Sequence, residues 1–167
     1  MRWLLFLLCG ALGAQDLRNV TEPKLPSAFC ATLEARFSAD QDAQLNTTRI
    51  QGALDRCPAG QAVRLIRHGE NRMFPIAPIH LKSGVTLVVD AGAVILASRN
   101  PRDYDMTPGS CGVVNKQGRG CRPLILAEHA PGAGIMGDGS IDGRGGAKLL
   151  GQNVTWWDLA HEAKVTD

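Results

Sequence analysis

Two aspartates, Asp138 and Asp142, lie four residues apart in a glycine-rich stretch near the end of the sequence. Two carboxyl groups held close together can act as a general acid and a general base. Each aspartate, however, directly precedes a glycine, and Asp-Gly pairs are typical of tight turns in which the carboxylate accepts a local backbone hydrogen bond. We therefore interpret both aspartates as turn residues, and no catalytic residue is predicted.

The same stretch contains the pattern G-x-G-x-x-G, from Gly132 to Gly137. In dinucleotide-binding proteins this pattern opens a helix whose N-terminus holds the pyrophosphate. Here seven of the fifteen residues 132–146 are glycine, so the segment cannot form that helix. We predict very short strands joined by glycine corners, and no nucleotide cofactor.

Other residue types that could do chemistry form no recognisable site. The tryptophan pair Trp156 and Trp157 could stack on a sugar ring or fill a core, and both interpretations stay open. The histidines lack the spacing of metal ligands, so neither a metal ion nor another cofactor is predicted. They are His68, His80, His129 and His161.

Four cysteines remain once the N-terminal segment is set aside: Cys30, Cys57, Cys111 and Cys121. An even number in an exported chain suits two disulfides, for which three pairings are possible. Cys111 and Cys121 bracket part of segment 101–122, and we expect them to staple it. Cys30 and Cys57 would then tie the N-terminal segment to a helix. A zinc site is the alternative, but closely paired ligands such as C-x-x-C are absent.

These residues must be positioned by short strands, because a strand–corner–strand pattern occurs twice. Residues 85–94 align with residues 133–141, with Leu87 on Ile135 and Val94 on Ile141. Without the different segment 101–122, the two copies are about 26 residues apart, a suitable length for one turn of a solenoid. A β-sandwich with regular turns is the alternative.

The pattern predicts strands at 62–66, 79–81, 85–89, 94–97 and 123–127. Side chains expected to point mostly inward are Leu87, Val89, Val94, Leu96, Leu124, Leu126, Ile135 and Ile141.

One amphipathic helix is predicted. Thr48 and Gln51 match a capping box, and Pro58 and Gly60 would end the helix. Its apolar stripe consists of Ile50, Ala53, Leu54 and Cys57. The end of a solenoid exposes strand edges and core, so we assign this helix as the cap of the N-terminal end.

Composition and the N-terminus limit the partners. A net charge of +2 without a dense basic run argues against nucleic acid. Arg2, the apolar run 3–12 and the small residues up to Ala14 indicate a signal peptide over 1–14, which is too short to span a bilayer. We expect a secreted or periplasmic protein that has no membrane segment after cleavage. Residues 15–41 are a lead-in, and 42–167 are a partial β-helix with an inserted loop at 101–122.

Three motifs in this order resemble the N-terminal part of glycoside hydrolase family 28, the polygalacturonase-like family. They lie at 47–55, 81–93 and 135–146, and Trp156 and Trp157 follow them. The resemblance covers roughly residues 42–158. It implies a right-handed parallel β-helix, and an enzyme that hydrolyses galacturonan or pectin-type bonds with inversion.

The catalytic motifs of that family come later in its chains: Asn-Thr-Asp, Asp-Asp, Gly-His-Gly and Arg-Ile-Lys. None occurs here, and Val165-Thr166-Asp167 does not match the first of them. No catalytic residue can therefore be carried over, and the substrate-binding residues are unknown.

We thus expect the N-terminal part of an exported polygalacturonase-like hydrolase, inactive by itself. If completed, it would act on an acidic plant-type polysaccharide. One alternative is a non-catalytic β-helix for carbohydrate binding or adhesion. Another is a fragment of a polysaccharide lyase, although the acidic cluster that calcium would need is not evident.

Overall fold

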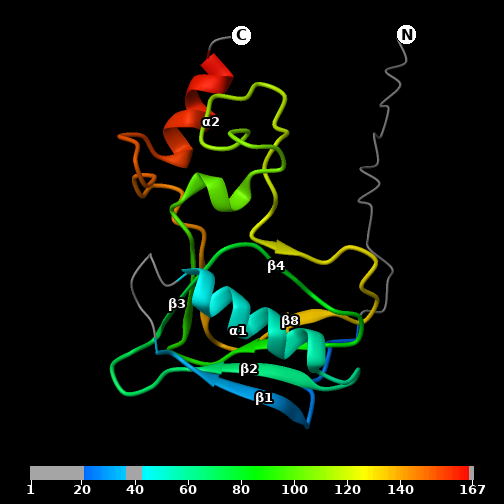
Figure 1. The fold of residues 1–167 in the computed structure, drawn as a ribbon. Helices are drawn as coiled ribbons and strands as arrows, with labels where there is room; N and C mark the ends of the chain where they lie inside the picture. The colour runs from blue at the N-terminus through cyan, green and yellow to red at the C-terminus, as the bar shows by residue number, and fades with distance from the viewer. Residues whose placement is uncertain (1–20, 37–42, 166–167) are drawn as a thin grey trace, which may run out of the picture.

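The protein is built from parallel strands that wind into a coil. The computed structural model describes residues 21–36 and 43–165, so the predicted signal peptide at 1–14 lies outside the described residues (Figure 1). One sheet has the order β1 (Phe29–Glu34), β2 (Ala62–Ile66), β5 (Thr86–Val89) and β8 (Gly134–Met136). The second has the order β3 (Met73–Ile76), β6 (Val94–Ala97) and β9 (Ser140–Asp142). The third pairs β4 (Ile79–His80) with β7 (Ile125–Leu126).

Every pairing between these strands is parallel. From β2 onward the chain visits the three sheets in turn and returns to the first one, one strand further along each time, whereas β1 and β2 are joined through α1. This is the predicted right-handed parallel β-helix, and a β-sandwich, which is built from antiparallel strands, is excluded.

The core consists of side chains stacked from one turn of the coil onto the next. In the first sheet, Val63 pairs with Leu87, and Leu87 pairs with Ile135. Val63 and Leu87 are fully buried, whereas Ile135 is 42% exposed. Ile135 points inward as predicted, but it belongs to the last strand of its sheet among the described residues, so no described strand packs beyond it.

The predicted inward positions on β6 are wrong by one residue. Val94 pairs with Ser140, and Ile95 pairs with Ile141, so the corner before β9 is one residue shorter than the sequence alignment assumed. Because side chains alternate between the two faces of a strand, a slip of one residue exchanges inside and outside. Ile95 is therefore fully buried, while Val94 and Leu96 are only half-buried.

Of four further side chains predicted to point inward, three lie on the core side and one lies on the outer face of its strand. Leu87 and Val89 are buried, and Leu124 packs against the core although it is only partly buried. Leu126 pairs with the exposed His80 in the third sheet, so it lies on the outward face of β7.

Helix α1 (Ala43–Arg56) covers the first end of the coil, as predicted. Its apolar stripe is buried, and the members are Ile50, Ala53, Leu54 and Cys57. It also satisfies backbone groups of the third sheet and the β3–β4 connection. The Thr47 hydroxyl accepts a hydrogen bond from Ala77 N (2.7 Å), and Gln51 both accepts from His80 N (2.8 Å) and donates to His80 O (3.1 Å).

The capping box predicted at Thr48 and Gln51 is wrong. The helix begins five residues earlier, at Ala43, and Thr48 lies inside it with its hydroxyl donating to Gln44 O (2.9 Å). Gln51 faces the third sheet instead of the helix N-terminus. The spacing of the two residues is that of a capping box. Their side chains form other hydrogen bonds, Thr48 to Gln44 O within the helix and Gln51 to the backbone of His80.

Two strands were not predicted. β1 lies inside the segment 15–41, for which the sequence analysis expected no strand, and β3 contains Pro75. Proline cannot donate a ladder hydrogen bond, which confines it to the edges of sheets. β3 is the first strand of its sheet, so Pro75 is tolerated there, and α1 lies against it.

A disulfide joins Cys30 on β1 to Cys57 just beyond α1, with Cα atoms 5.5 Å apart. A second disulfide joins Cys111 to Cys121 in the inserted segment, with Cα atoms 5.4 Å apart. The first one therefore links the two elements that close the N-terminal end of the coil.

We expect the chain to self-associate through the exposed edge formed by β7, β8 and β9. Ile135 and Ile141, which is 45% exposed, are stacked on buried residues, and no described strand pairs with β8 or β9 on their other side. The double substitution Ile135→Lys and Ile141→Lys should lower the oligomer fraction in sedimentation velocity, whereas Val113→Lys, an exposed apolar position in the inserted segment, should not. A monodisperse parent monomer with a sharp two-state melt would contradict this expectation.

We expect the Cys30–Cys57 disulfide to contribute more stability than Cys111–Cys121, because it closes the longer loop, 27 against 10 residues. The loop-entropy relation gives about 3–4 kcal/mol for the first and about 2–3 kcal/mol for the second. Urea unfolding followed by circular dichroism, on the two Cys→Ala double variants, measures both. A larger loss for the Cys111/Cys121 variant would show that loop entropy does not govern the difference.

Candidate functional site

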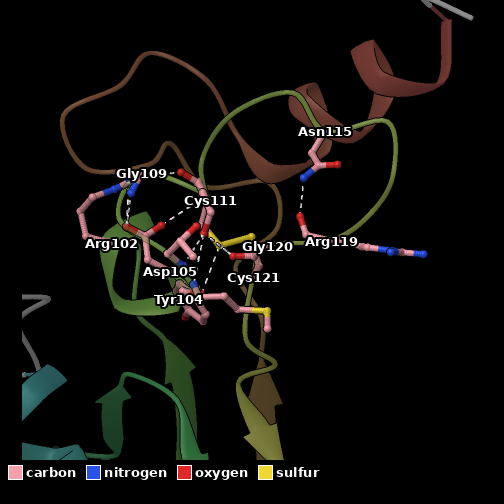
Figure 2. The surroundings of a disulfide bond; sticks show 12 residues. Arg102, Tyr104, Asp105, Gly109, Cys111, Asn115, Arg119, Gly120 and Cys121 are labelled. Atoms are coloured by element: carbon pink, nitrogen blue, oxygen red, sulfur yellow. Dashed lines mark hydrogen bonds and ion pairs between the residues drawn. A yellow bond between two sulfur atoms is a disulfide. The ribbon is translucent and has the colours of Figure 1, made fainter.

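The inserted segment 101–122 is a compact loop at the side of the coil, and Figure 2 shows its centre. It opens with a 3-10 helix, η2 (Pro101–Tyr104), which is capped by Asn100 through a hydrogen bond from Arg102 N to Asn100 Oδ1 (3.1 Å). The Cys111–Cys121 disulfide closes the loop, as the position of the two cysteines in the sequence suggested.

Asp105 organises this loop. Its carboxylate accepts hydrogen bonds from Gly109 N (2.9 Å) and Cys111 N (2.8 Å), and Arg102 forms an ion pair with it at 3.0 Å. Desolvation raises the pKa of Asp105, but the two backbone hydrogen bonds and the Arg102 charge lower it more, so the net pKa lies below its usual value. The ionised form of Asp105 is thus the form that holds the loop together.

Tyr104 connects the loop to the C-terminal helix. Its ring is buried, and its hydroxyl donates to Ser98 O (2.9 Å). Burial and the nearby Asp103 raise the pKa of Tyr104, so it stays neutral over the physiological range. The ring of Trp156 meets Tyr104 edge to face, with centroids 5.8 Å apart and planes at 85°.

Helix α2 (Trp156–Val165) begins with a true capping box. Asp158 N donates to the Thr155 hydroxyl (3.0 Å), and Asp158 accepts from Thr155 N (2.8 Å). The hydrogen bonds from Thr155 lower the pKa of Asp158 below its usual value. This box sets the direction in which the helix starts, and with it the directions of the two tryptophans.

The two tryptophans have different environments. Trp156 is half-buried against Tyr104, whereas Trp157 is 71% exposed. The indole of Trp157 lies against the backbone of Gly145 and Gly146; a Cβ atom at Gly145 would be only 2.4 Å from its Nε1. Trp157 N also donates to Gly145 O (3.1 Å), so the ring is held at the surface by a close backbone contact.

A groove of about 680 Å³ lies between the inserted loop, the segment after β9 and α2. Ala97 and Leu124 contribute to its apolar lining, at the turns from the second to the third sheet. Its aromatic and charged lining residues are Tyr104, Arg122, Asp142, Arg144, Trp156 and Trp157. The volume is in the range of ligand-binding pockets in proteins.

The structure separates the two aspartates that the sequence singled out. Asp142 lines the groove, and its Oδ1 accepts from Arg144 N (2.7 Å), which is the local turn contact expected of an Asp-Gly pair. Asp138 is exposed at the corner between β8 and β9 and does not line the groove. The two carboxyl groups therefore do not share one site.

The other sequence patterns are also accounted for. The Gly132–Gly137 pattern runs into strand β8 instead of a helix. At Gly137, φ is +106° and a Cβ atom would be 2.2 Å from Val89 O, so this corner requires glycine. Within the described part of the chain, no group of three His, Cys, Asp or Glu side chains could hold a metal ion.

The sequence did not single out three of the groove residues: Tyr104, Arg122 and Arg144. Tyr104 and Arg122 lie at the two ends of the inserted segment, and Arg144 lies in the turn after β9 with φ at +52°. No local pattern marks them, because only the stacking of successive turns brings these segments together.

The fold and groove define a class: a parallel β-helix with a lateral groove built by its long turns. No family model matches the chain. The chain is 43% identical to an endo-polygalacturonase of Pectobacterium parmentieri over 162 residues, which are 97% of this chain and 38% of that relative. It is 43% identical to a polygalacturonase of Ralstonia nicotianae (strain ATCC BAA-1114 / GMI1000), covering 93% of this chain and 33% of that relative.

Solved structures give the same result. The polygalacturonase from Erwinia carotovora ssp. carotovora superposes with a TM-score of 0.81 at 43% identity, over 91% of this chain and 38% of that one. A family 28 exopolygalacturonase of Yersinia enterocolitica is more distant, with a TM-score of 0.51 at 28% identity over 69% of this chain and 21% of that one.

The resemblance to the polygalacturonase-like family is therefore confirmed. The chain spans less than two fifths of the curated relatives it matches, which agrees with a resemblance to their N-terminal portion only. Among the described helices, none is long and apolar enough to cross a membrane.

We expect the inserted loop to loosen in acid. Because the folded-state pKa of Asp105 is lowered, its stabilising effect is present above the unfolded pKa, about 3.9, and is lost as pH falls through the folded value. Amide hydrogen exchange at Gly109 and Cys111 should therefore accelerate, after correction for intrinsic rates, below about pH 4.

The matched control is Asp105→Asn, which keeps an acceptor oxygen but cannot be ionised. Its exchange at Gly109 and Cys111 should be faster at neutral pH and should lose most of the acid transition. An unchanged transition in this variant would show that another carboxyl group is responsible.

Proposed function

We propose that this chain is the N-terminal part of an exported polygalacturonase-like glycoside hydrolase, which hydrolyses galacturonan or pectin-type bonds with inversion. The observation that carries the proposal is the 43% identity with named polygalacturonases over nearly the whole of this chain. The close superposition on a solved polygalacturonase supports it as well. Its substrate would be an acidic polysaccharide.

The described turns supply the scaffold of such an enzyme and not its reacting groups. Inverting hydrolysis needs two carboxyl groups about 6.5–9.5 Å apart, one to protonate the leaving oxygen and one to activate water. In the groove, Asp142 is engaged in a turn with Arg144, and Asp138 lies elsewhere. The family's catalytic motifs do not occur in residues 1–167. The chain alone is therefore inactive in this proposal.

Export is the second part of the proposal. The basic and apolar residues of segment 1–14 have the pattern of a signal peptide. Two disulfides are typical of proteins that fold in an oxidising compartment, outside the cytosol. Cleavage after residue 14 would leave a lead-in over 15–41 and the β-helix over 42–167.

A non-catalytic carbohydrate-binding β-helix is the competing function. The exposed Trp157 beside Arg122 and Arg144 favours it, because aromatic and cationic side chains suit an acidic sugar without any catalytic acid. The two functions differ in whether bonds are broken once the remaining turns are present.

We expect no release of reducing ends when the purified chain is incubated with polygalacturonate or pectin. General acid catalysis contributes about 10²–10⁴-fold and requires a correctly placed acid, which the described residues of the groove do not supply. The assay should include Asp138→Asn, Asp142→Asn and an active full-length Pectobacterium endo-polygalacturonase as the positive control.

A fusion of this chain to the matching remainder of that enzyme should restore hydrolysis. Turnover by the chain alone that both substitutions abolish would show that the aspartates are catalytic. A correctly folded fusion that binds but does not cleave would favour the carbohydrate-binding function.

A further inference from the structure

A second, smaller pocket lies at another corner of the coil and shares no lining residue with the groove. It has a volume of about 170 Å³ and lies between segment 67–72, which joins β2 to β3, and segment 90–93, which joins β5 to β6. We call it the corner pocket, and its lining residues are Arg67, Gly69, Glu70, Arg72 and Gly92. Pockets for drug-sized ligands measure about 300–1,000 Å³, so the corner pocket has the size for a small ion.

Two arginines meet at the corner pocket because the segment that carries them is a tight turn. His68 N donates to Asn71 O (2.7 Å), and Asn71 N donates to His68 O (2.9 Å), so the segment folds back on itself around the two residues between them. Arg67 and Arg72 are the next pair of opposite residues, and like charges placed opposite each other are destabilising. An anion between the two side chains would relieve this repulsion.

Neither arginine has an anionic partner within the described part of the chain, and neither guanidinium forms a hydrogen bond there. Two nearby carboxylates are engaged elsewhere. The Glu34 carboxylate lies 3.1 Å from His68 Nδ1, and the Asp90 carboxylate is bound by Arg64 (2.6 Å). Glu70 lines the corner pocket but forms no ion pair with either arginine of its lining. The positive charge of this corner is therefore left for a ligand.

We propose that the corner pocket binds a phosphate group between Arg67 and Arg72. Each planar guanidinium presents a fork of N–H donors that matches the oxygens of a phosphate. A tetrahedral phosphate has oxygens for two such forks at once, whereas a carboxylate has only two oxygens and suits one guanidinium. The inference is independent of the proposed function, because it uses neither the groove nor an acidic sugar.

The backbone around the corner pocket is fixed before a ligand arrives. Arg72 O accepts a hydrogen bond from Val94 N (2.8 Å), which ties the tight turn to β6 in the next turn of the coil. At Gly92, φ is +79° and a Cβ atom would be 3.4 Å from Arg67 Cδ, so the arginine stem lies directly on this residue. A site that is already ordered loses little conformational entropy on binding. A bound phosphate would also link two successive turns of the coil.

The test is an NMR titration of the purified chain with inorganic phosphate near neutral pH, followed on the amide resonances of Gly69 and Gly92. Ionic strength is held constant with sodium chloride, because salt screens exposed charges. We expect saturation with a Kd of about 1–10 mM. Acetate is the carboxylate probe, and it should bind at least about tenfold more weakly.

Glycerol 3-phosphate distinguishes the two sources of a phosphate group. Affinity equal to that of inorganic phosphate supports a site that also takes a phosphate monoester, such as a lipid headgroup. Weaker binding of the ester supports a site for the free ion.

Variants distinguish a built site from general charge attraction. Arg67→Gln and Arg72→Gln should each weaken phosphate binding at least about tenfold. Glu70→Gln should strengthen it, because this change removes a negative charge from the lining. Arg119→Gln is the matched control, since it removes one positive charge outside the corner pocket. Each arginine variant should stay folded, because it relieves a repulsion, and circular dichroism checks this.

Equal binding of acetate and phosphate, or equal losses in Arg119→Gln and Arg67→Gln, would overturn the proposal, as would the absence of saturation. Weaker binding by Glu70→Gln would also contradict it. Shifts at Gly69 and Gly92 that persist in the double variant Arg67→Gln and Arg72→Gln would show that phosphate acts at another place. None of these outcomes affects the proposed function, because no residue of the groove is involved.

Discussion

Parallel stacking of one turn of the coil on the next is the interaction on which the rest of this structure depends. A strand of three or four residues buries little by itself, and it is stable only when its inward side chain lies between those of the neighbouring turns. Phe74, Ile95 and Ile141 form such a stack, and burial decreases from complete at the first two to half at the last. The core is therefore most fully buried at the N-terminal end of the coil. There α1, β1 and the Cys30–Cys57 disulfide provide the cover that a preceding turn of the coil would otherwise give.

The groove is a consequence of the same stacking. The long turn is the one from β6 in the second sheet to β7 in the third, which contains the inserted loop, and because successive turns lie side by side, this loop lies beside the segment after β9. The inserted loop and the segment after β9 are ordered by local contacts. These are the hydrogen bonds from backbone N–H groups to Asp105, the Cys111–Cys121 disulfide and the Thr155–Asp158 capping box. Loops held on a rigid scaffold are where binding residues are commonly found.

This arrangement separates scaffold from chemistry. The strands account for the likeness to the Erwinia polygalacturonase, whereas the reacting carboxyl groups of an inverting hydrolase are not found among the described residues of the groove. A shared fold does not by itself transfer an activity, so the proposed function depends on the identity with named polygalacturonases and on the properties of the site. Binding of an acidic sugar and cleavage of its bonds can then be tested apart from each other.

The sequence by itself determined the repeating strands, the amphipathic helix and the turn role of Asp142, because these depend on neighbours close in the chain. It also carried the family resemblance in its ordered motifs. The tertiary structure alone decided which face of β6 is inward, since the length of a corner, and not the pattern of the strand, sets the register. It decided that the capping box lies at Thr155 and not at Thr48, because the same residue spacing occurs at both, but Thr48 lies inside a helix that begins at Ala43, whereas Thr155 directly precedes α2. It likewise gave Trp156 a packing role and left Trp157 at the surface, since the groove forms from segments that are far apart in the chain.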